Sequence, residues 1–304
     1  MYDTIIIGSG PAGLSAAVYG ARARLNGLVL EKAAMSGGQM VLTDQVDNYL
    51  GCNETSGFEL AMAFRAHAEA AGAVFQEANV TGIRKTEQGF CVETEAGEQL
   101  ETKTVILATG AVHRQLGVPG EAELAARGVS YCATCDGAFF RNRTVLVAGG
   151  GDTALSDALY LSRLCEKVYL VHRRETLRGS KGLQEQVFQK ENIVFLPCRE
   201  IRAIQGDGKV EAVQLVDNRT GAEERLETSA VFIAVGMEPV TEYAQSLHIL
   251  DEQGYAIAGE DCRCLMEGIF AAGDVRTKSV RQIATAVGDG AVVIGSVEAY
   301  LQKV

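Results

Sequence analysis

The sequence predicts an α/β protein made of two similar βαβ units, with the second unit inserted into the first. Three observations predict this fold. A pattern of strand, glycine-rich turn, helix and strand occurs twice, starting at residues 4 and 144. Two further apolar runs, 104–110 and 230–236, read as buried strands that end in glycine. A third such run, 268–275, has no βαβ unit of its own.

The two copies of the pattern match in detail. In the first, the β-branched run 4–7 leads into the turn GSGPAG (8–13), a helix expected from about Ala12 to Arg24, and a strand at 28–30. In the second, the run 144–147 leads into GGGDTA (149–154), a helix expected to about Leu164, and a strand at 168–171. The turn and the end of the second strand are equally spaced, because Gly8 and Glu31 lie 23 positions apart, as do Gly149 and His172.

Glycine-rich turns in this position are typical of dinucleotide binding. The first glycine permits a tight turn, the second lets the backbone approach a pyrophosphate, and the third position, Gly13 or Ala154, lets helix and strand pack closely. The helix N-terminus then offers free N–H groups to the phosphates. A glycine-rich turn in an ordinary α/β protein is the alternative, and two copies in the same context disfavour it. We therefore expect two Rossmann-like domains.

The copies differ where the nucleotide ribose is recognised. Glu31 ends the second strand of the first copy, where a carboxylate accepts hydrogen bonds from ribose hydroxyls. The second copy has His172, Arg173 and Arg174 there, with Arg178 one turn further. Guanidinium groups bind a 2′-phosphate, which a carboxylate repels. The second site is thus predicted to take NADPH rather than NADH, with a solvated basic loop as the alternative.

The run 268–275 (GIFAAGDV) is expected to return to the first domain and complete it. The predicted domains are accordingly 1–114 and 241–304 for the first, and 115–240 for the inserted one.

Composition and charge exclude several classes of function. With 28 Lys and Arg against 39 Asp and Glu, the net charge of −11 disfavours binding to nucleic acid or to an anionic membrane. No run approaches the roughly 18 apolar residues of a membrane span. Met1 leads directly into the first strand without a signal peptide, so we expect a cytoplasmic protein. The eight cysteines do not form a disulfide scaffold there, and most are expected to be buried.

The segment Cys132-Ala-Thr-Cys135-Asp136-Gly is the candidate for redox chemistry. A C-x-x-C pair in a cytosolic α/β protein is typical of a reversible disulfide, and Asp136 is placed to transfer a proton as thiol and thiolate interchange. The alternatives are two inert buried thiols or a zinc site. Zinc needs more ligands, and Cys262-Arg263-Cys264 has an atypical spacing, so no metal is expected.

With these features in place, the whole chain resembles the low-molecular-weight thioredoxin reductase family. The matching motifs are GSGPAG (8–13), SGGQ (36–39), ATG (108–110), CATCDG (132–137), GGGDTA (149–154), HRRETLR (172–178), GIFAAGDV (268–275) and RQIATAVGDG (281–290). The resemblance implies a homodimeric enzyme that passes electrons from NADPH through FAD to the cysteine pair and on to thioredoxin or a thioredoxin-like protein. A related flavin disulfide reductase or dithiol oxidase, with another redoxin or oxygen as acceptor, and a redox sensor without turnover are the alternatives.

The resemblance also implies roles for individual residues. Cys135 would face the flavin and Cys132 would attack the partner's disulfide, while the inserted domain rotates about hinges near 112–118 and 237–241. The residues implied to bind FAD are Gly8, Gly10, Gly13, Glu31, Gly38, Gln39, Asn48, Thr109, Gly110, Asp274, Arg281 and Gln282. Those implied to bind NADPH are Gly149, Gly151, Asp152, Thr153, His172, Arg173, Arg174 and Arg178.

Overall fold

The computed structural model describes residues 1–43, 45–46, 48–52 and 55–304. The chain divides into two compact units, Met1–Val112 with Glu238–Val304, and His113–Met237. The second unit is inserted in the first, as the sequence predicts, although the chain crosses at 112/113 and 237/238 rather than at 114/115 and 240/241. It crosses in strands β7 (Ala111–His113) and β16 (Met237–Pro239), which pair with each other.

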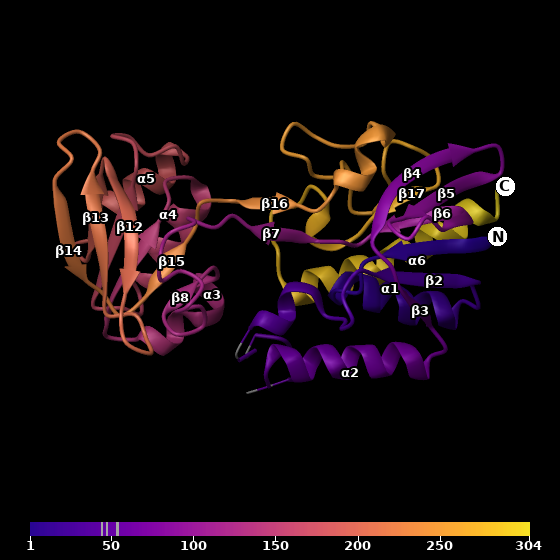
Figure 1. Ribbon diagram of the computed structural model, residues 1–304, viewed down its shortest axis with the longest axis horizontal. Helices are drawn as coiled ribbons and strands as arrows, with labels where there is room; N and C mark the ends of the chain where they lie inside the picture. The colour runs from indigo at the N-terminus through magenta and orange to yellow at the C-terminus, as the bar shows by residue number, and fades with distance from the viewer. Residues whose placement is uncertain (44, 47, 53–54) are drawn as a thin grey trace. The chain divides into compact units, whose positions relative to one another are not determined.

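The first unit contains a sheet with strand order β3-β2-β1-β6-β5-β4, and β17 also pairs with β6 (Figure 1). Strands β1, β2, β3, β6 and β17 are parallel, and β4 and β5 extend the sheet antiparallel. Their bounds are β1 (Tyr2–Ile7), β2 (Gly27–Glu31), β3 (Val74–Glu77), β4 (Val80–Thr86), β5 (Gly89–Thr94), β6 (Gln99–Leu107) and β17 (Ile269–Ala271). Because Phe270 aligns with Ile106, the C-terminal segment returns to complete this sheet.

Helices from both ends of the chain pack together in this unit. Helix α1 (Pro11–Arg22) contacts α6 (Ile283–Leu301) closely, since a Cβ added at Gly290 would lie 2.4 Å from the Ala12 carbonyl oxygen. By length and composition alone, helix α6 could cross a membrane. However, 39% of its most apolar window is buried, and buried core helices can have the same length and composition. Helix α2 (Gly57–Ala70) begins with a capping box formed by Ser56 and Glu59.

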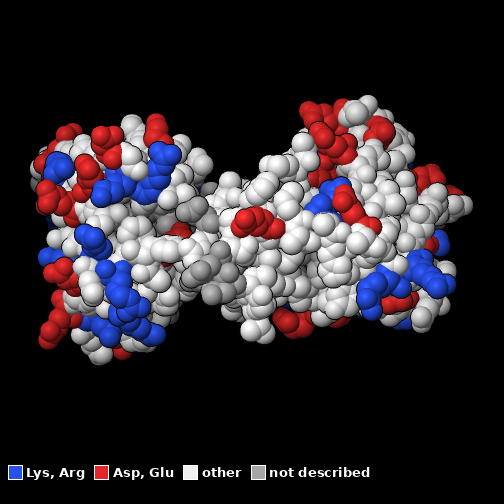
Figure 2. All heavy atoms as spheres, turned by 90° about the horizontal axis from the view of Figure 1, so that it is seen from below, with Lys and Arg blue, Asp and Glu red and all other residues white. Residues whose placement is uncertain are grey.

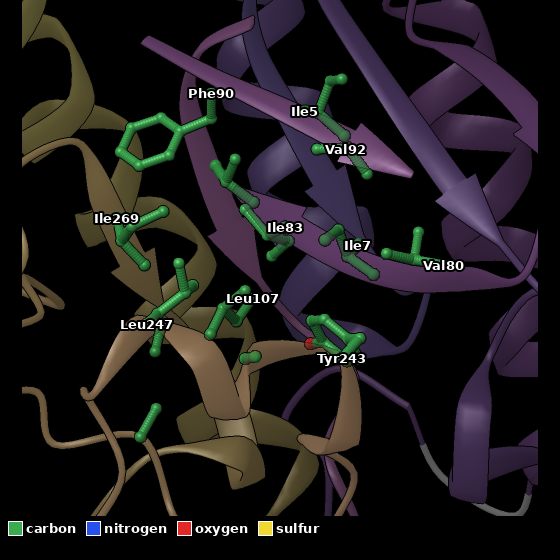
Figure 3. Packing of buried hydrophobic residues seen from close by; sticks show 14 of the residues in the cluster. Ile5, Ile7, Val80, Ile83, Phe90, Val92, Leu107, Tyr243, Leu247 and Ile269 are labelled. Carbon is green, nitrogen blue, oxygen red and sulfur yellow. The ribbon is translucent and has the colours of Figure 1, made fainter. Parts of the chain in front are cut away.

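The second half of β1, Ile5–Ile7, is apolar because both faces of its sheet are covered there. Ile5 and Ile7 lie in one buried cluster with residues of β4, β5 and η3 (Glu242–Leu247), as Figure 3 shows. Ile6 points to the opposite cluster, formed largely by α1 and α6. Alternation along the strand thus places consecutive isoleucines in two different cores.

The second unit contains a parallel sheet with strand order β11-β10-β9-β15-β8 and a separate antiparallel sheet, β12-β13-β14. The strands are β8 (Val129–Ser130), β9 (Thr144–Ala148), β10 (Lys167–His172), β11 (Ile193–Pro197), β12 (Arg199–Gln205), β13 (Ala212–Asp217), β14 (Glu223–Glu227) and β15 (Val231–Ile233). The helices of this unit are α3 (Ala133–Asp136), α4 (Asp152–Leu161) and α5 (Lys181–Phe188), with the short 3₁₀ helix η2 (Gly137–Phe140). The first unit has two further short 3₁₀ helices, η1 (Gly38–Leu42) and η4 (Gly273–Val275). Helices α1 and α4 both end earlier than expected.

Candidate functional site

The turn between β1 and α1 has the geometry of a phosphate cradle. Gly8 adopts a φ of +101°, which disfavours any residue with a side chain. A Cβ at Gly13 would lie 1.9 Å from the Gly8 carbonyl oxygen, whereas a Cβ at Gly10 would meet nothing within 4 Å. Gly10 is also the N-cap of α1, and no side chain caps this helix end in the described structure. The turn is therefore tight where it packs on the protein and open where a pyrophosphate would approach, which fits FAD.

Glu31 lies at the end of β2 within a polar network. Its Oε2 accepts hydrogen bonds from Ser9 N (2.8 Å) and Ser9 Oγ (2.7 Å). The Ser9 hydroxyl also contacts Ser36 Oγ at 2.8 Å, and Arg65 Nη1 of α2 donates to Ser36 Oγ at 2.8 Å. The network orients the Glu31 carboxylate beside the glycine turn. Sequence reasoning missed Ser9, Ser36 and Arg65, although the first two lie inside quoted motifs.

Two residues predicted to line the flavin come together from distant parts of the chain. Asn48 Nδ2 donates to Gln282 Oε1 at 3.2 Å. Gly38 begins η1 with a φ of +56°, and a Cβ there would lie 3.5 Å from Gly10 Cα. Gln39 follows it, half-buried. The start of η1 therefore lies beside the glycine turn, and Asn48 lies beside the residue that caps α6.

Asp274 and Arg281 each have a buried polar atom that forms no hydrogen bond with the described residues. Asp274 Oδ1 and Arg281 Nε are buried and have no hydrogen-bond partner among the described residues. Burial raises the pKa of the Asp274 carboxyl to about 6. The Arg281 guanidinium lies 4.4 Å from the centroid of the Tyr255 ring. Unsatisfied buried groups of this kind are rare, and they fit the polyhydroxylated chain of a bound flavin.

Thr109 and Gly110 follow β6 at the same end of the sheet. Thr109 Oγ1 donates to the Val240 carbonyl oxygen at 2.6 Å and lies 2.8 Å from the hydroxyl of Tyr243. Gly110 has a φ of +69°. Within the described structure, the Thr109 hydroxyl is thus engaged by its own unit, and its backbone is what remains for a ligand.

The turn between β9 and α4 repeats the first cradle. A Cβ at Gly149, which has a φ of +154°, would lie 2.4 Å from the Ala234 carbonyl oxygen. A Cβ at Gly151, the N-cap of α4, would meet nothing within 4 Å. Asp152 Oδ1 accepts a hydrogen bond from Ser180 N at 2.6 Å, and Thr153 is exposed beside it. The second turn is likewise closed toward the sheet and open at the helix end.

The basic residues after β10 lie next to this turn. His172 is buried, and a Cβ at Gly150 would come within 2.5 Å of its ring. His172 Nε2 has no partner among the described residues. Burial lowers the pKa of this imidazole, as do the charges of Arg178, Arg174 and Arg173. A neutral ring with an unused buried nitrogen fits a bound nucleotide.

The three arginines of this loop are available for an anion. Arg173, Arg174 and Arg178 are exposed, and none forms an ion pair within the described ranges. Figure 2 shows Lys and Arg side chains gathered on the visible face of the inserted unit, at left, despite the net charge of −11. The loop fits a nucleotide that carries an additional phosphate.

Cys132 and Cys135 form a disulfide at the start of α3. Both are half-buried, and Cys135 N donates to Cys132 Sγ at 3.2 Å. Ser130 of β8 accepts from Cys132 N at 3.1 Å and donates to Asp136 Oδ2 at 2.5 Å. The structure therefore brings the three predicted catalytic residues together, and Ser130, which sequence reasoning missed, connects two of them.

The remaining cysteines are free in the described structure, and most are buried. Burial raises the pKa of Cys262 and of Cys264 to about 12, so both are poor nucleophiles. Among the described residues, no group of three or more His, Cys, Asp or Glu is arranged to hold a metal ion.

Glu121 is a further residue that sequence reasoning missed. It is buried, and its carboxylate accepts hydrogen bonds from Leu116 N (3.0 Å), Gly117 N (2.7 Å) and the hydroxyl of Tyr131 (2.7 Å). Tyr131 immediately precedes Cys132 and stacks on His113 with ring centroids 5.1 Å apart. Glu121 thereby ties the 116–117 segment to the residue before the disulfide.

Comparisons with known proteins agree with this geometry. A family model described as pyridine nucleotide-disulphide oxidoreductase matches residues 2–290. The chain is 45% identical over 301 residues to a thioredoxin reductase of Treponema pallidum, covering 99% of this chain and 97% of the relative. It is 43% identical over 304 residues to that of Listeria innocua, covering 100% and 95%. The crystal structure of thioredoxin reductase from Streptococcus pyogenes superposes with a TM-score of 0.94 at 46% identity, covering 100% of this chain and 99% of the other.

Proposed function

The chain belongs to the pyridine nucleotide-disulphide oxidoreductase family, and on that basis we propose that it is an NADPH-dependent flavoprotein that reduces thioredoxin. Electrons pass from NADPH through FAD to the Cys132–Cys135 disulfide and on to the partner's disulfide. The observation that carries this proposal is the disulfide itself, placed immediately before the second dinucleotide-type βαβ unit.

The reduced pair completes the reaction by thiol–disulfide exchange. The Cys132 thiolate attacks one sulfur of the partner's disulfide, and the other sulfur leaves as a thiolate that takes up a proton. Cys135 then attacks Cys132 Sγ, which restores the enzyme disulfide and releases the second thiol of the partner. Two electrons move to the partner in all. Asp136, whose Oδ2 accepts a hydrogen bond from Ser130 Oγ, would donate and accept the protons.

The first unit is proposed to hold FAD, which when bound accepts two electrons from NADPH and delivers them to a disulfide. Gly8, Gly10 and Gly13 would bind its pyrophosphate at the N-terminus of α1, and Glu31 its adenosine ribose. The remaining proposed contacts are those of Gly38, Gln39, Asn48, Thr109, Gly110, Asp274, Arg281 and Gln282.

The inserted unit is proposed to hold NADPH. Gly149, Gly151, Asp152 and Thr153 would lie along its pyrophosphate at the start of α4, and the loop His172, Arg173, Arg174 and Arg178 would bind the 2′-phosphate. Among the residues that the structure describes, the three guanidinium groups form no ion pair and His172 Nε2 has no hydrogen-bond partner, which supports this assignment.

We further propose a cytoplasmic homodimer that binds neither membrane nor nucleic acid. The resemblance to bacterial thioredoxin reductases supports the dimer, and the net charge of −11 opposes binding to polyanions. Light scattering after size exclusion measures the mass, which should be twice 32.4 kDa; a monomer would contradict the dimer.

The decisive experiment is an anaerobic NADPH oxidation assay against thioredoxin and other thioredoxin-like proteins from the same cell. Purified protein should be yellow and should reduce thioredoxin at a rate well above background. Faster reduction of another redoxin would identify that redoxin as the partner instead of thioredoxin. Rapid turnover with oxygen alone would favour a dithiol oxidase. Protein that cannot take up FAD would contradict the proposal itself.

A further inference from the structure

The hairpin between β13 and β14, two strands labelled in Figure 1, contacts the basic loop that follows β10. Asn218, the first residue after β13, donates from Nδ2 to the Arg173 carbonyl oxygen at 3.1 Å. Its backbone N donates to the Cys198 carbonyl oxygen at 2.8 Å. Asn218 therefore holds two segments that lie far from it in sequence.

Cys198 adds a second bond to the same loop. Its backbone N donates to the Arg174 carbonyl oxygen at 3.2 Å, so the two consecutive carbonyls of Arg173 and Arg174 are both held. Cys198 is buried and has a φ of +55°, a conformation rare for residues with a side chain. Such a conformation persists where surrounding contacts impose it, and here its N–H and its C=O are both engaged.

The hairpin turn is itself anchored by Asp217. This buried carboxylate accepts Arg219 N at 2.8 Å and also binds the guanidinium groups of Arg219 and Arg199. These hydrogen bonds, first of all that of the Arg219 side chain, lower the pKa of Asp217, so it is ionised at neutral pH. Asp217 thus holds in place the turn that carries Asn218 and its amide donor.

In the described part of the chain, the contacts that position Arg173 and Arg174 are made by their backbone carbonyls, while their side chains are exposed. Neither side chain makes an ion pair within the described structure, so the position of each guanidinium group depends on the position of its main chain. Binding of a phosphate by two guanidinium groups depends strongly on their spacing and direction. A loop that shifts would lose affinity for a 2′-phosphate but not for a nucleotide without one.

We propose that Asn218 is a positioning residue for recognition of the 2′-phosphate, acting through the backbone of Arg173. The inference rests on the proposed binding of that phosphate by Arg173 and Arg174. It assigns part of the coenzyme specificity to a hairpin outside the βαβ unit that binds the nucleotide.

The test compares Asn218→Leu, which keeps the volume and removes the donor, with the matched control Asn192→Leu. Asn192 Nδ2 also donates to backbone carbonyls of the inserted unit, those of Ser162 and Cys165, but it precedes β11 at the strand end opposite Cys198. Titration calorimetry with adenosine 2′,5′-bisphosphate and with 5′-AMP measures binding independently of turnover. Steady-state kinetics of the FAD-loaded enzyme with NADPH and NADH gives a second readout.

Asn218→Leu should weaken binding of the bisphosphate about fivefold, the equivalent of one neutral hydrogen bond, and leave 5′-AMP unchanged. The KM for NADPH should rise by a similar factor with unchanged kcat, and the values for NADH should not move. Asn192→Leu should change neither ratio. Equal weakening of both nucleotides by Asn218→Leu, or none, would overturn the inference.

Arg173→Ala separates this inference from the proposed function. If Arg173→Ala lowers the preference for the bisphosphate and Asn218→Leu does not, the phosphate site stands and the positioning role fails. If Arg173→Ala and Arg174→Ala both leave the preference unchanged, the phosphate is bound elsewhere, and both proposals are wrong.

Discussion

Ser130 Oγ donates a 2.5 Å hydrogen bond to Asp136 Oδ2 across the start of the disulfide segment. The same oxygen accepts the backbone N–H of Cys132. Ser130 is buried on β8, which pairs with β15, so the sheet holds the hydroxyl in place. Ser130 therefore holds Asp136, the proposed acid, in a fixed position relative to Cys132.

Replacing Ser130 with Ala should slow disulfide reduction about tenfold, because a hydrogen bond to a charged group contributes about 1.5 kcal/mol. The KM for NADPH should stay the same, since the Ser130 hydroxyl bonds only to Cys132 and Asp136 among the described residues. Ser130→Thr keeps the hydroxyl and should recover most of the rate. Stopped-flow measurement of thioredoxin reduction checks this; a normal rate in Ser130→Ala would remove Ser130 from the mechanism.

Cys135→Ser should separate the two halves of the reaction. NADPH should still bleach the flavin absorbance, because hydride transfer does not use the thiols, while thioredoxin reduction should fall to background. Cys52→Ser, which changes a half-buried free thiol, serves as the control and should be fully active. Undiminished turnover by Cys135→Ser would contradict the proposed electron path.

Gly13→Ala and Gly10→Ala should fail in different ways. The Gly13 methyl would lie 1.9 Å from a backbone oxygen, so this variant should lose about 3 kcal/mol of unfolding free energy even without FAD. Gly10 has a φ of −71° and open space around it, so its variant should fold normally yet bind FAD more weakly. Urea denaturation of the flavin-free proteins and FAD titration distinguish the two. Normal FAD affinity in Gly10→Ala would argue against a pyrophosphate there.

Asp289→Asn should destabilise the first unit in a pH-dependent way. Asp289 accepts hydrogen bonds from Gly273 N, Arg276 and Lys278, all at 2.8–2.9 Å, with both cations buried. Burial opposes ionisation of Asp289, but these bonds prevail and lower its pKa below the usual 3.8. Removing the charge takes from Lys278 its buried ion-pair partner and leaves Arg276 with only the exposed Glu260 carboxylate, 3.7 Å away, which should cost about 3 kcal/mol at pH 7.

The sign of the pH effect follows from that lowered pKa. A carboxyl with a lower pKa in the folded state stabilises the protein above about pH 4 and loses this contribution as the pH falls further. The difference between wild type and Asp289→Asn should thus be constant from pH 7 to about pH 5 and shrink below pH 4. Urea denaturation at several pH values measures it. Asp261→Asn, which removes an exposed ion pair with Arg263, should change stability by less than about 1 kcal/mol.

The sequence predicts the fold class because its signals are local and occur twice. In each copy the glycine turn directly follows an apolar run, and its first glycine lies 23 positions before the end of β2 or β10, so spacing alone indicates two βαβ units. The return of the C-terminal segment follows from the absence of a third unit. The pairing of Phe270 with Ile106 bears this out.

The supporting contacts of the site were not predictable in the same way. Asn218 and Arg173 are 45 residues apart, and Arg65 and Ser36 are 29 apart, with no shared pattern that relates them. Glu121 reads as one of many acidic residues in a loop until the structure shows its carboxylate buried among donors. Such residues are recognised only when tertiary structure brings their partners to them.

The discontinuous outer unit also constrains how the newly made chain folds. A ribosome releases the whole of His113–Met237 before it makes β17 and α6, and these two elements complete the sheet and the helix layer begun by residues 1–112. The middle of the protein can accordingly fold while the outer unit still lacks its last strand and α1 lacks its helical neighbour. Ala12 and Gly290 can meet only after translation has passed the whole inserted unit, β17 and the first half of α6.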